Sequence, residues 1–559
     1  MKKESEIKNI THSMKSNATV LLLSLILITG ILTGCVQAPD DTSNAANTSN
    51  TANSYNGGVT ITEQPLASAP DYAEKIFSTN IITLEILADE AQWQTMLDNA
   101  TDEEYIKVDV VINGTTFKDV GIRPKGNSSL KQVASSDSDR YSFRIKFDKY
   151  VEGQTCFGLD QLVVNNMMGD NTYMKEYISY DLMKTIDVEA PYFGFADISV
   201  NGQPWGLYLA VELYNDSYET RVYGDTSGAL YNVKMSMGQD QLPGEGRGPM
   251  VNDPAMDARP SAGSGASESV PPTTPPSDSP ASGLDQAPGN FPANAPAGFP
   301  GGKGGGMGAR NGGSLAYTDD DPDSYSDIFD NVVGDEDAAA NQRVITALKA
   351  LSAGTDLETC FDTDAILRYL AAHTVVVNLD SYSSTMAQNY YLYERGGRLT
   401  VLPWDYNLAW GGFQSGDASD VINFPIDTPV SGVAMTDRPL LNQLLSNQDY
   451  LAQYHDHLNT LIQNYFTSGH FTTKIQALNT LISDYVKKDA TAFCTYEEYQ
   501  TAVAAFIELG NLRAESIQGQ LNGEIPSTSD GQNADPSTLI SADGLRLQDL
   551  GSMMGERKN

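Results

Sequence analysis

Two aspartates lie on either side of a predicted hairpin in the second half of the chain. Asp380 follows a predicted helix, Asn389 starts the hairpin, and Asp405 comes directly after it. Because a hairpin folds back on itself, the loops that carry the two carboxylates can lie side by side. Phosphoryl transfer uses such a pair: one carboxylate orients the acceptor hydroxyl, another holds Mg²⁺ on the phosphates, and an asparagine often helps.

Two other interpretations fit the same spacing. Asp380 could cap a turn and Asp405 could end a strand, with no chemical role for either. Paired acids on loops are also what glycoside cleavage requires. The spacing alone leaves all three interpretations open.

The first half of the chain offers groups that could face phosphates. A strand runs into a polar, glycine-containing loop that carries Lys125, Asn127 and Ser128, and exposed amides and hydroxyls in such loops can approach phosphates. Lys146 lies between apolar neighbours on an alternating strand. It is therefore either a solvated lysine or a phosphate-binding lysine held by Glu176 of the following helix.

The periodicity of the apolar residues predicts the elements that would position these groups. Before residue 235 it indicates strands and one clear helix, over 173–185; Glu212 ends the last of these strands. After residue 319 it indicates mainly helices, with the hairpin 389–402 among them. The predicted strands are 81–86, 106–112, 120–123, 141–147, 195–200 and 206–212, and the predicted helical stretches are 337–352, 364–376 and 438–520.

Composition divides the chain into segments. Pro, Gly, Ser and Ala dominate 236–318, and a similar composition begins near 521, so we expect a disordered insert at 236–318 and a disordered tail at 521–559. The segment 35–60 is rich in Asn, Thr, Ser and Ala and is predicted to be a flexible tether. The folded part would then consist of 61–235 and 319–520.

The N-terminus has the pattern of a signal peptide. Several lysines precede an apolar run at 18–32, which is shorter than the roughly 20 residues of a spanning helix. Leu32-Thr33-Gly34-Cys35 resembles a lipobox, so we expect 1–34 to be removed and Cys35 to carry lipid at the extracytoplasmic face of the cell membrane. The alternative is an uncleaved anchor helix. The net charge of −37 argues against nucleic acid as a partner.

The other three cysteines give no metal motif. Cys156, Cys360 and Cys494 are far apart and form no Cys-x-x-Cys pair. Unpaired, buried thiols are the preferred interpretation. One long-range disulfide is the alternative in an oxidising compartment.

Four segments together resemble the spore-coat protein CotH family of atypical kinases. Their order and spacing are more specific than any one of them alone. The segments are RPKGNSSL at 123–130, YMKEYISYDLMK at 173–184, NGQPWGLYLAVE at 201–212, and NLDSYSSTMAQNYYLY with LPWDYNLAWGG within 378–412.

The resemblance implies an α+β, bilobal, atypical protein-kinase-like fold with a β-rich N-lobe and a mainly helical C-lobe. It also implies transfer of the γ-phosphate of ATP, with Mg²⁺ or Mn²⁺, to Ser or Thr of a surface or coat protein. The implied roles are phosphate binding by Lys146, positioning of that lysine by Glu176, a place near the adenine for Glu212, catalysis by Asp380, and metal binding by Asn389 and Asp405.

The sequence departs from the family pattern at one site position. Family members usually carry an acidic residue two positions after the metal-binding aspartate, and here that residue is Asn407. A lost carboxylate would weaken a second metal site. The alternative function is therefore a catalytically silent, kinase-like surface scaffold or adhesion protein.

Overall fold

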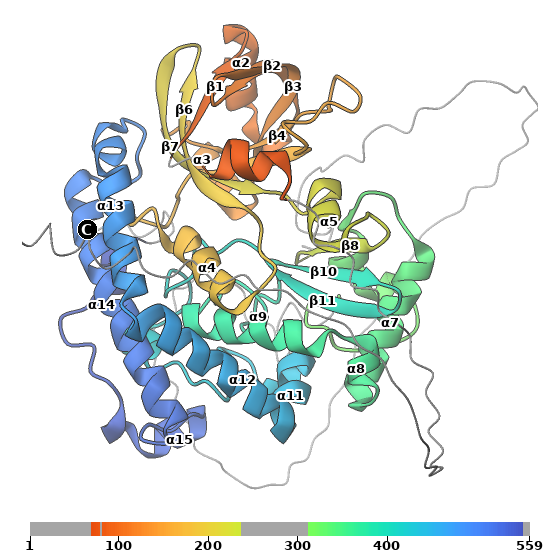
Figure 1. Cartoon of the computed structure of the whole chain (residues 1–559), viewed down its shortest axis with the longest axis vertical. Coiled ribbons are helices and arrows are strands. Elements are labelled where there is room, and N and C mark those ends of the chain that lie inside the picture. Colours follow the sequence, from red (N-terminus) through yellow and green to blue (C-terminus); the bar gives the residue numbers. More distant parts are fainter. Residues whose placement is uncertain (1–68, 79–80, 236–310, 552–559) are drawn as a thin grey trace, which may run out of the picture. The chain divides into compact units, whose positions relative to one another are not determined.

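The computed structural model describes residues 69–78, 81–235 and 311–551, all of which belong to one compact unit. The predicted signal peptide, the tether with Cys35 and residues 236–310 of the predicted insert lie outside the described residues. The described part has the predicted mixed α+β composition, with a strand-rich first part and a helical second part (Figure 1).

The first part is a closed barrel in the strand order β1-β2-β3-β4-β5-β7-β6, closed by the parallel pair β1–β6. Every other neighbouring pair is antiparallel. Short helices α2 and α3 accompany it, and α4 lies between the barrel and the helices of the second part (Figure 1). The bounds are β1 Ile82–Leu87, α2 Glu90–Asp98, β2 Ile106–Ile112, β3 Thr115–Lys125, α3 Ser128–Ala134, β4 Ser142–Lys146, β5 Gln161–Asn165, α4 Lys175–Met183, β6 Phe193–Val200 and β7 Gln203–Glu212.

The barrel follows from alternation and from its turns. Alternate residues of β3 and β4, among them Ile122, Phe143 and Ile145, are fully buried in the barrel core, so the residues between them face outwards. Two hairpins turn at Asn113-Gly114 and Asn201-Gly202, where both residues of each pair have positive φ. Asn-Gly pairs favour this left-handed backbone, which matches the twist of antiparallel strands.

The second part surrounds a small sheet in the order β11-β10-β8-β9. Helices α9, α11 and α12 lie below this sheet in the view of Figure 1, and α13 and α14 run along one side of the barrel and sheet. The bounds are α5 Asp216–Tyr223, β8 Ala229–Val233, α6 Ser326–Phe329, β9 Val332–Val333, α7 Ala338–Ala353, α8 Leu357–Cys360, α9 Thr363–Val376, β10 Tyr390–Arg395, β11 Arg398–Pro403, α10 Ala418–Ile422, α11 Pro439–Ser446, α12 Gln448–Leu461, α13 His470–Lys488, α14 Tyr496–Leu521 and α15 Ser529–Ala534.

Two predicted disordered boundaries are wrong where the structure describes them. Ser314 and Leu315, at the end of the predicted insert, are each only 1% exposed. The predicted tail also packs on the helices as far as Gly551, with Leu547 and Leu550 buried. Composition could not show this, because a few well-placed apolar side chains anchor a chain that is otherwise polar.

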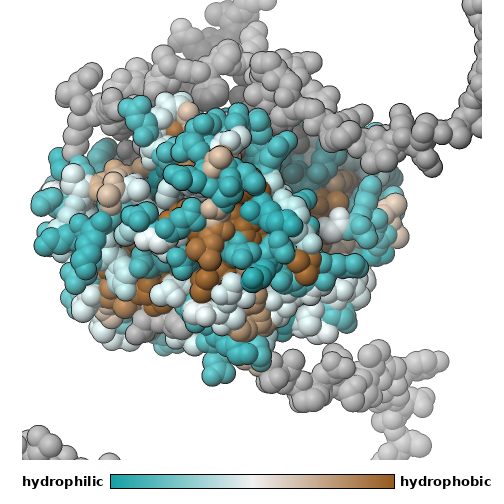
Figure 2. Space-filling model, turned by 90° about the horizontal axis from the view of Figure 1, so that it is seen from above, coloured by the Kyte–Doolittle hydropathy of each residue, from teal (hydrophilic) through white to brown (hydrophobic). Residues whose placement is uncertain are grey.

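The described cysteines are unpaired: Cys156 is buried, and Cys360 and Cys494 are partly buried. Within the described ranges, none of the helices combines the length and the apolar character needed to cross a bilayer. Seen from above, the surface is mainly hydrophilic, with apolar residues visible between the polar ones (Figure 2).

Candidate functional site

The loops that carry Asp380 and Asp405 lie side by side, as the hairpin predicted. The side chain of Asn378 joins them: its Oδ1 accepts a hydrogen bond from the Asp380 amide at 3.2 Å, and its Nδ2 donates to the Asp405 carbonyl at 3.3 Å. Asn378 follows the end of α9, where Val377 takes a left-handed conformation and stops the helix. One residue therefore sets the relative position of both loops.

Asp380 is held by two amide side chains. Gln388 Nε2 donates to its Oδ1 at 3.1 Å, and Asn389 Nδ2 donates to its Oδ2 at 3.0 Å and to its carbonyl at 2.8 Å. The two predicted residues Asp380 and Asn389 are thus in direct contact. The amide oxygen of Asn389 is still an acceptor that a cation could use.

The carboxylates of the site repel each other. Burial, and then the charge of Asp405, raises the pKa of Asp380 to about 7. The same two causes raise the pKa of Glu176 to about 7. Burial also raises the pKa of Asp405, while the positive charge of Lys125 acts in the opposite direction. Perturbed acids that crowd one place are typical of functional sites.

Glu176 belongs to a polar chain that ends at Lys125. Asn165 Nδ2 donates to Glu176 Oε2 at 2.9 Å, and Lys125 Nζ donates to Asn165 Oδ1 at 3.2 Å. The hydroxyl of Tyr180, one turn along α4, donates to Glu176 Oε1 at 3.2 Å. The ammonium of Lys125 also lies 5.9 Å from the centre of the Trp404 ring, next to Asp405.

The lysine associated with Glu176 is Lys125, and the structure does not form the predicted Lys146–Glu176 pair. Lys146 is opposite Gly121 in the strand register, four positions along β3 from Lys125. Its Nζ lies 3.7 Å from Asp148, and its side chain is 34% exposed. The sequence shows which face of a strand a lysine takes, but the distance along the strand depends on the register.

The carboxylate of Glu212 is fully used by contacts within the protein. Its carboxylate accepts hydrogen bonds from the Tyr72 hydroxyl at 2.5 Å, from the Tyr192 amide at 2.8 Å and from Arg221 Nη2 at 2.7 Å. The side chain is fully buried. Glu212 therefore fastens the end of β7 to α5 and to the first described segment, and the place of its neighbourhood near the adenine stays a prediction.

The predicted phosphate loop is exposed. Asn127 and Ser128 are on the surface directly before and at the start of α3, and Asn127 Oδ1 accepts a hydrogen bond from Lys131 Nζ at 3.3 Å. Gly126 between Lys125 and Asn127 has a φ of 132°, which is a conformation that favours glycine. The loop thus turns sharply just beyond the lysine of the site.

Asn407 has a structural contact. Its Nδ2 donates to the Met168 carbonyl at 3.2 Å. Met168 belongs to the loop that precedes α4, the helix of Glu176. The residue at which this chain departs from the family pattern therefore links the Asp405 loop to the approach to α4.

Sequence reasoning missed three buried side chains near the site: His373 and Arg438 contact the site loops, and Arg513 holds the end of α9 against the segment after α10. His373 contacts the Tyr406 hydroxyl at 3.0 Å and Ser383 Oγ at 3.1 Å, and burial lowers its pKa to about 4, so it is neutral. The other two are arginines whose guanidinium groups donate to backbone carbonyls: Arg438 to Tyr382 and Ser384, and Arg513 to Thr374, Val375, Ile422 and Phe424. Arg513 is a lone cation within the helical stretch of α14, whereas Arg438 stands before the first residue of α11 and leaves no such signal.

A divalent cation fits the donor set of this site. Asp380 and Asp405 supply two mutually repelling carboxylates, and Asn389 supplies an amide oxygen beside them. No group of three or more His, Cys, Asp or Glu side chains in the described ranges is placed to hold a metal. Mg²⁺ is often bound by only one or two carboxylates, with phosphate and water as its other ligands.

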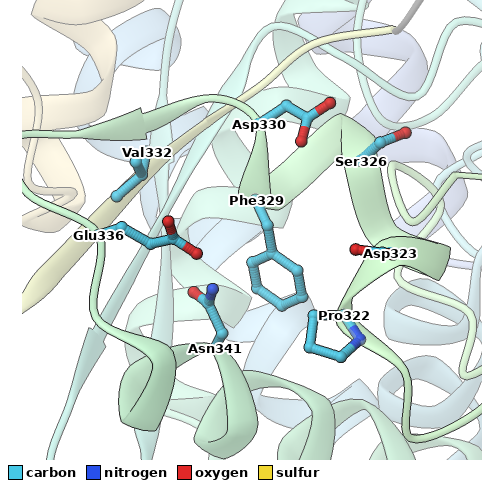
Figure 3. Close-up of a pocket in the computed structure, with 8 residues that line it drawn as sticks. All are labelled: Pro322, Asp323, Ser326, Phe329, Asp330, Val332, Glu336 and Asn341. Atoms are coloured by element: carbon cyan, nitrogen blue, oxygen red, sulfur yellow. The ribbon is translucent and has the colours of Figure 1, made fainter. Parts of the chain in front are cut away.

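A separate cavity of about 490 Å³ lies elsewhere in the second part and contains none of the predicted site residues. The ring of Phe329 lies at its centre, with acidic side chains around it (Figure 3). Its lining is Pro322, Asp323, Ser326, Phe329, Asp330, Val332, Glu336 and Asn341. The chemistry described above therefore belongs to the loops of Asp380 and Asp405 and not to this cavity.

Comparison with known proteins identifies the family. The model of the family described as CotH kinase protein matches residues 122–517, a span that includes the barrel strands β4 to β7, the helices α4 to α13 and both aspartate loops. The chain therefore belongs to the CotH family. It is also 29% identical over 132 residues to the inner spore coat protein H of Bacillus subtilis (strain 168), a match that spans 23% of this chain and 33% of that relative.

Proposed function

We propose that this chain is a bilobal, atypical protein-kinase-like enzyme that transfers the γ-phosphate of ATP to Ser or Thr of a protein. The observation that carries the proposal is the convergence of Asp380, Asp405 and Lys125, which come from three separate segments. Phosphoryl transfer depends mainly on positioning and on charge placed around the phosphates, and this set offers both signs of charge. Membership of the CotH family supports the same activity.

Each side chain takes the role that its surroundings allow. Asp380 would accept the proton of the acceptor hydroxyl as the oxygen attacks the γ-phosphorus, and the bond from that phosphorus to the bridging β,γ-oxygen breaks, which leaves ADP and a phosphoester. Asp405 and Asn389 would hold Mg²⁺ or Mn²⁺, which neutralises phosphate charge when bound. Lys125 would contact the phosphates from the barrel side, in place of Lys146, and Glu176 with Asn165 would hold Lys125 in place.

The acceptor and the location form part of the proposal. We expect export, lipid on Cys35, and a surface or coat protein as the acceptor, because the lipobox-like sequence would tether the enzyme at the extracytoplasmic face. Replacement of Cys35 by alanine should move the protein from the membrane fraction to the soluble fraction. Retention in the membrane fraction would instead favour the uncleaved anchor helix.

A transfer assay tests the enzyme directly. Purified protein is incubated with Mg²⁺ or Mn²⁺, ATP labelled in the γ-phosphate and a casein-like acceptor, and the label in Ser or Thr is measured. Asp405→Asn should reduce incorporation by at least about 100-fold. Asp119→Asn is a matched control, because Asp119 is a half-exposed aspartate of the barrel that pairs with Lys107.

The alternative is a catalytically silent scaffold, which the replacement of the usual acidic residue by Asn407 favours. Under that alternative the wild-type protein incorporates no label, and ATP does not raise its melting temperature. Label that is incorporated by the wild type and lost in Asp405→Asn excludes the scaffold.

A further inference from the structure

Four cationic side chains of β3 and β4 lie on the same side of the barrel wall. Lys125 and Arg123 alternate with buried residues on β3, and Arg144 and Lys146 do so on β4, so all four side chains point away from the barrel core. In the register, Arg123 is opposite Arg144 and Lys125 is opposite Ser142. Arg144 is therefore about 7 Å from the level of Lys125 along the strands, at about 3.3 Å per residue.

Lys125 and Arg144 differ in the charges that they act on. Lys125 makes no ion pair in the described ranges and donates to the neutral amide of Asn165, but its charge acts on the nearby carboxylates of Asp405 and Glu176. Arg144 Nε donates to the amide oxygen of Gln161 at 2.7 Å, and Arg144 makes no ion pair with any carboxylate in the part of the chain that the structure describes. Its charge has a neutral partner only.

A second cation makes the surroundings of Arg144 more positive. Burial, and then the charge of Arg144, lowers the pKa of Arg123 to about 10, although Arg123 also pairs with Glu103. On the other side, the buried phenol of Tyr391 in β10 is within electrostatic reach of both Arg144 and Asp405. Two guanidinium groups thus lie opposite each other on the outer face of β3 and β4, and crowding of like charges costs free energy unless an anion relieves it.

We propose that Arg144 is an anion-binding residue on the outer face of β3 and β4, which binds a phosphate group of an oligophosphate ligand at a point separate from Lys125. The inference rests on the proposed function in one respect, since both place a phosphate group beside Lys125. A planar guanidinium can make two parallel hydrogen bonds to one phosphate, which suits an anion better than a neutral nucleoside base. The ligand would therefore carry one anionic group beside Arg144 and another beside Lys125.

Equilibrium binding to the full chain tests this without any turnover. Three probes are titrated by calorimetry at fixed, low salt: inorganic tripolyphosphate, ATP and adenosine. The variant Arg144→Gln removes the charge, Arg144→Lys retains it, and Lys146→Gln is the matched control two positions along the same face of β4. Thermal unfolding of each variant shows that it is folded.

The expected result is that Arg144→Gln weakens tripolyphosphate and ATP at least 10-fold, while Arg144→Lys restores part of the affinity and Lys146→Gln changes it less than 2-fold. Adenosine binding should be the same in all four proteins. Tighter binding of ATP than of tripolyphosphate would assign the oligophosphate to a nucleotide, and equal affinities would assign it to a free polyphosphate chain.

The inference is overturned if Arg144→Gln leaves tripolyphosphate binding within 2-fold of the wild type. It is also overturned if the variant weakens adenosine as much as ATP, because a base would then lie on Arg144. Failure of the proposed enzyme looks different: the wild type would bind tripolyphosphate through Arg144 and still transfer no phosphate to protein.

Discussion

Charge is arranged in opposite ways in two places: at the contact between the barrel and the end of α13, and at the site where Lys125 of β3 meets the aspartate loops. In the contact, Arg140 Nη1 donates to Asp489 Oδ2 at 2.7 Å, both side chains are at most 1% exposed, and Asp489 Oδ2 also accepts from the Leu207 amide at 3.0 Å. At the site, burial and the charge of Asp405 raise the pKa of Asp380, so the two carboxylates repel each other.

The difference separates structural charges from functional ones. A buried ion pair whose hydrogen bonds are all made fixes one geometry, and removal of either partner leaves an uncompensated charge. Crowded like charges lower the stability of the folded protein and are retained where a ligand supplies the missing opposite charge. The comparison predicts that substitutions have opposite effects on stability in the two places.

The largest expected effect is in the contact. Arg140→Met leaves Asp489 buried without its cation, and we expect a loss of about 3–5 kcal/mol in the free energy of unfolding. The double variant Arg140→Met, Asp489→Leu should be less destabilised than the single one, because no lone charge remains. Urea denaturation measures both. A loss under about 1 kcal/mol in the single variant would show that the contact is not a structural pair.

The next effect concerns the C-terminal segment, residues 546–551. This segment joins the loop before α4 to the loop that carries Asp405. The Asn171 amide donates to the Leu550 carbonyl at 3.0 Å, and Leu547 packs so closely over Gly411 that a Cβ there would be 3.0 Å away. A chain that ends at Leu545 loses two buried leucines, so we expect a loss of about 2–4 kcal/mol.

Hydrogen exchange shows which residues lose stability in the shortened chain. Amides of 168–174 should exchange faster in the shortened chain, whereas the barrel strands should be unchanged. A chain that ends at Gly551 retains Leu547 and Leu550 and is the control. Equal exchange in all three proteins would show that the segment does not hold the site.

Asp405→Asn should have a smaller effect of opposite sign. It removes a charge that repels Asp380 and Glu176, so we expect a gain of about 1–2 kcal/mol in the unfolding free energy at pH 8 without metal. Asp380 and Glu176 have pKa values of about 7 when folded and ordinary values of 3.8 and 4.5 when unfolded. Between those values the folded state holds more protons, so wild-type stability falls as the pH rises.

The gain should therefore be small at pH 5 and full at pH 8, and thermal unfolding at the two pH values measures it. Addition of Mg²⁺ should raise the melting temperature of the wild type more than that of the variant. A variant that is less stable than the wild type at pH 8 would contradict the repulsion between the carboxylates.

The smallest effect is expected at Lys146. This side chain is one-third exposed and its nearest carboxylate is 3.7 Å away, so Lys146→Gln should change stability by less than about 0.5 kcal/mol and ATP affinity by less than 2-fold. Lys125→Gln should weaken ATP at least 10-fold. A reversed order in calorimetric titrations would restore Lys146 as the phosphate-binding lysine.

Local patterns in the sequence predicted much of the fold. The Asn113-Gly114 and Asn201-Gly202 turns and the strands on either side of them are where alternation and turn chemistry put them. The fully buried strand β5 was missed because its five residues show no alternation of apolar and polar side chains. Closure of the barrel was missed as well, because the pairing of β1 with β6 joins distant segments.

The candidate site was predictable where one hairpin builds it and not where several segments meet. Asp380, Asn389 and Asp405 are brought together by β10 and β11, which are neighbours in sequence. The choice between Lys125 and Lys146 depends on strand register, and the contact of Asn165 with Glu176 depends on how α4 docks. Neither of these leaves a periodic signal in the chain.

The contact between Asn171 and the C-terminal segment also sets an order in time. Asn171 donates a hydrogen bond to the Asp549 carbonyl, and the two residues are 378 positions apart. A ribosome adds roughly 5–20 residues per second, so the second partner is made about 20–75 s after the first. The barrel can form while synthesis continues, but the loop ahead of α4 receives these contacts only after residues 549 and 550 have been made.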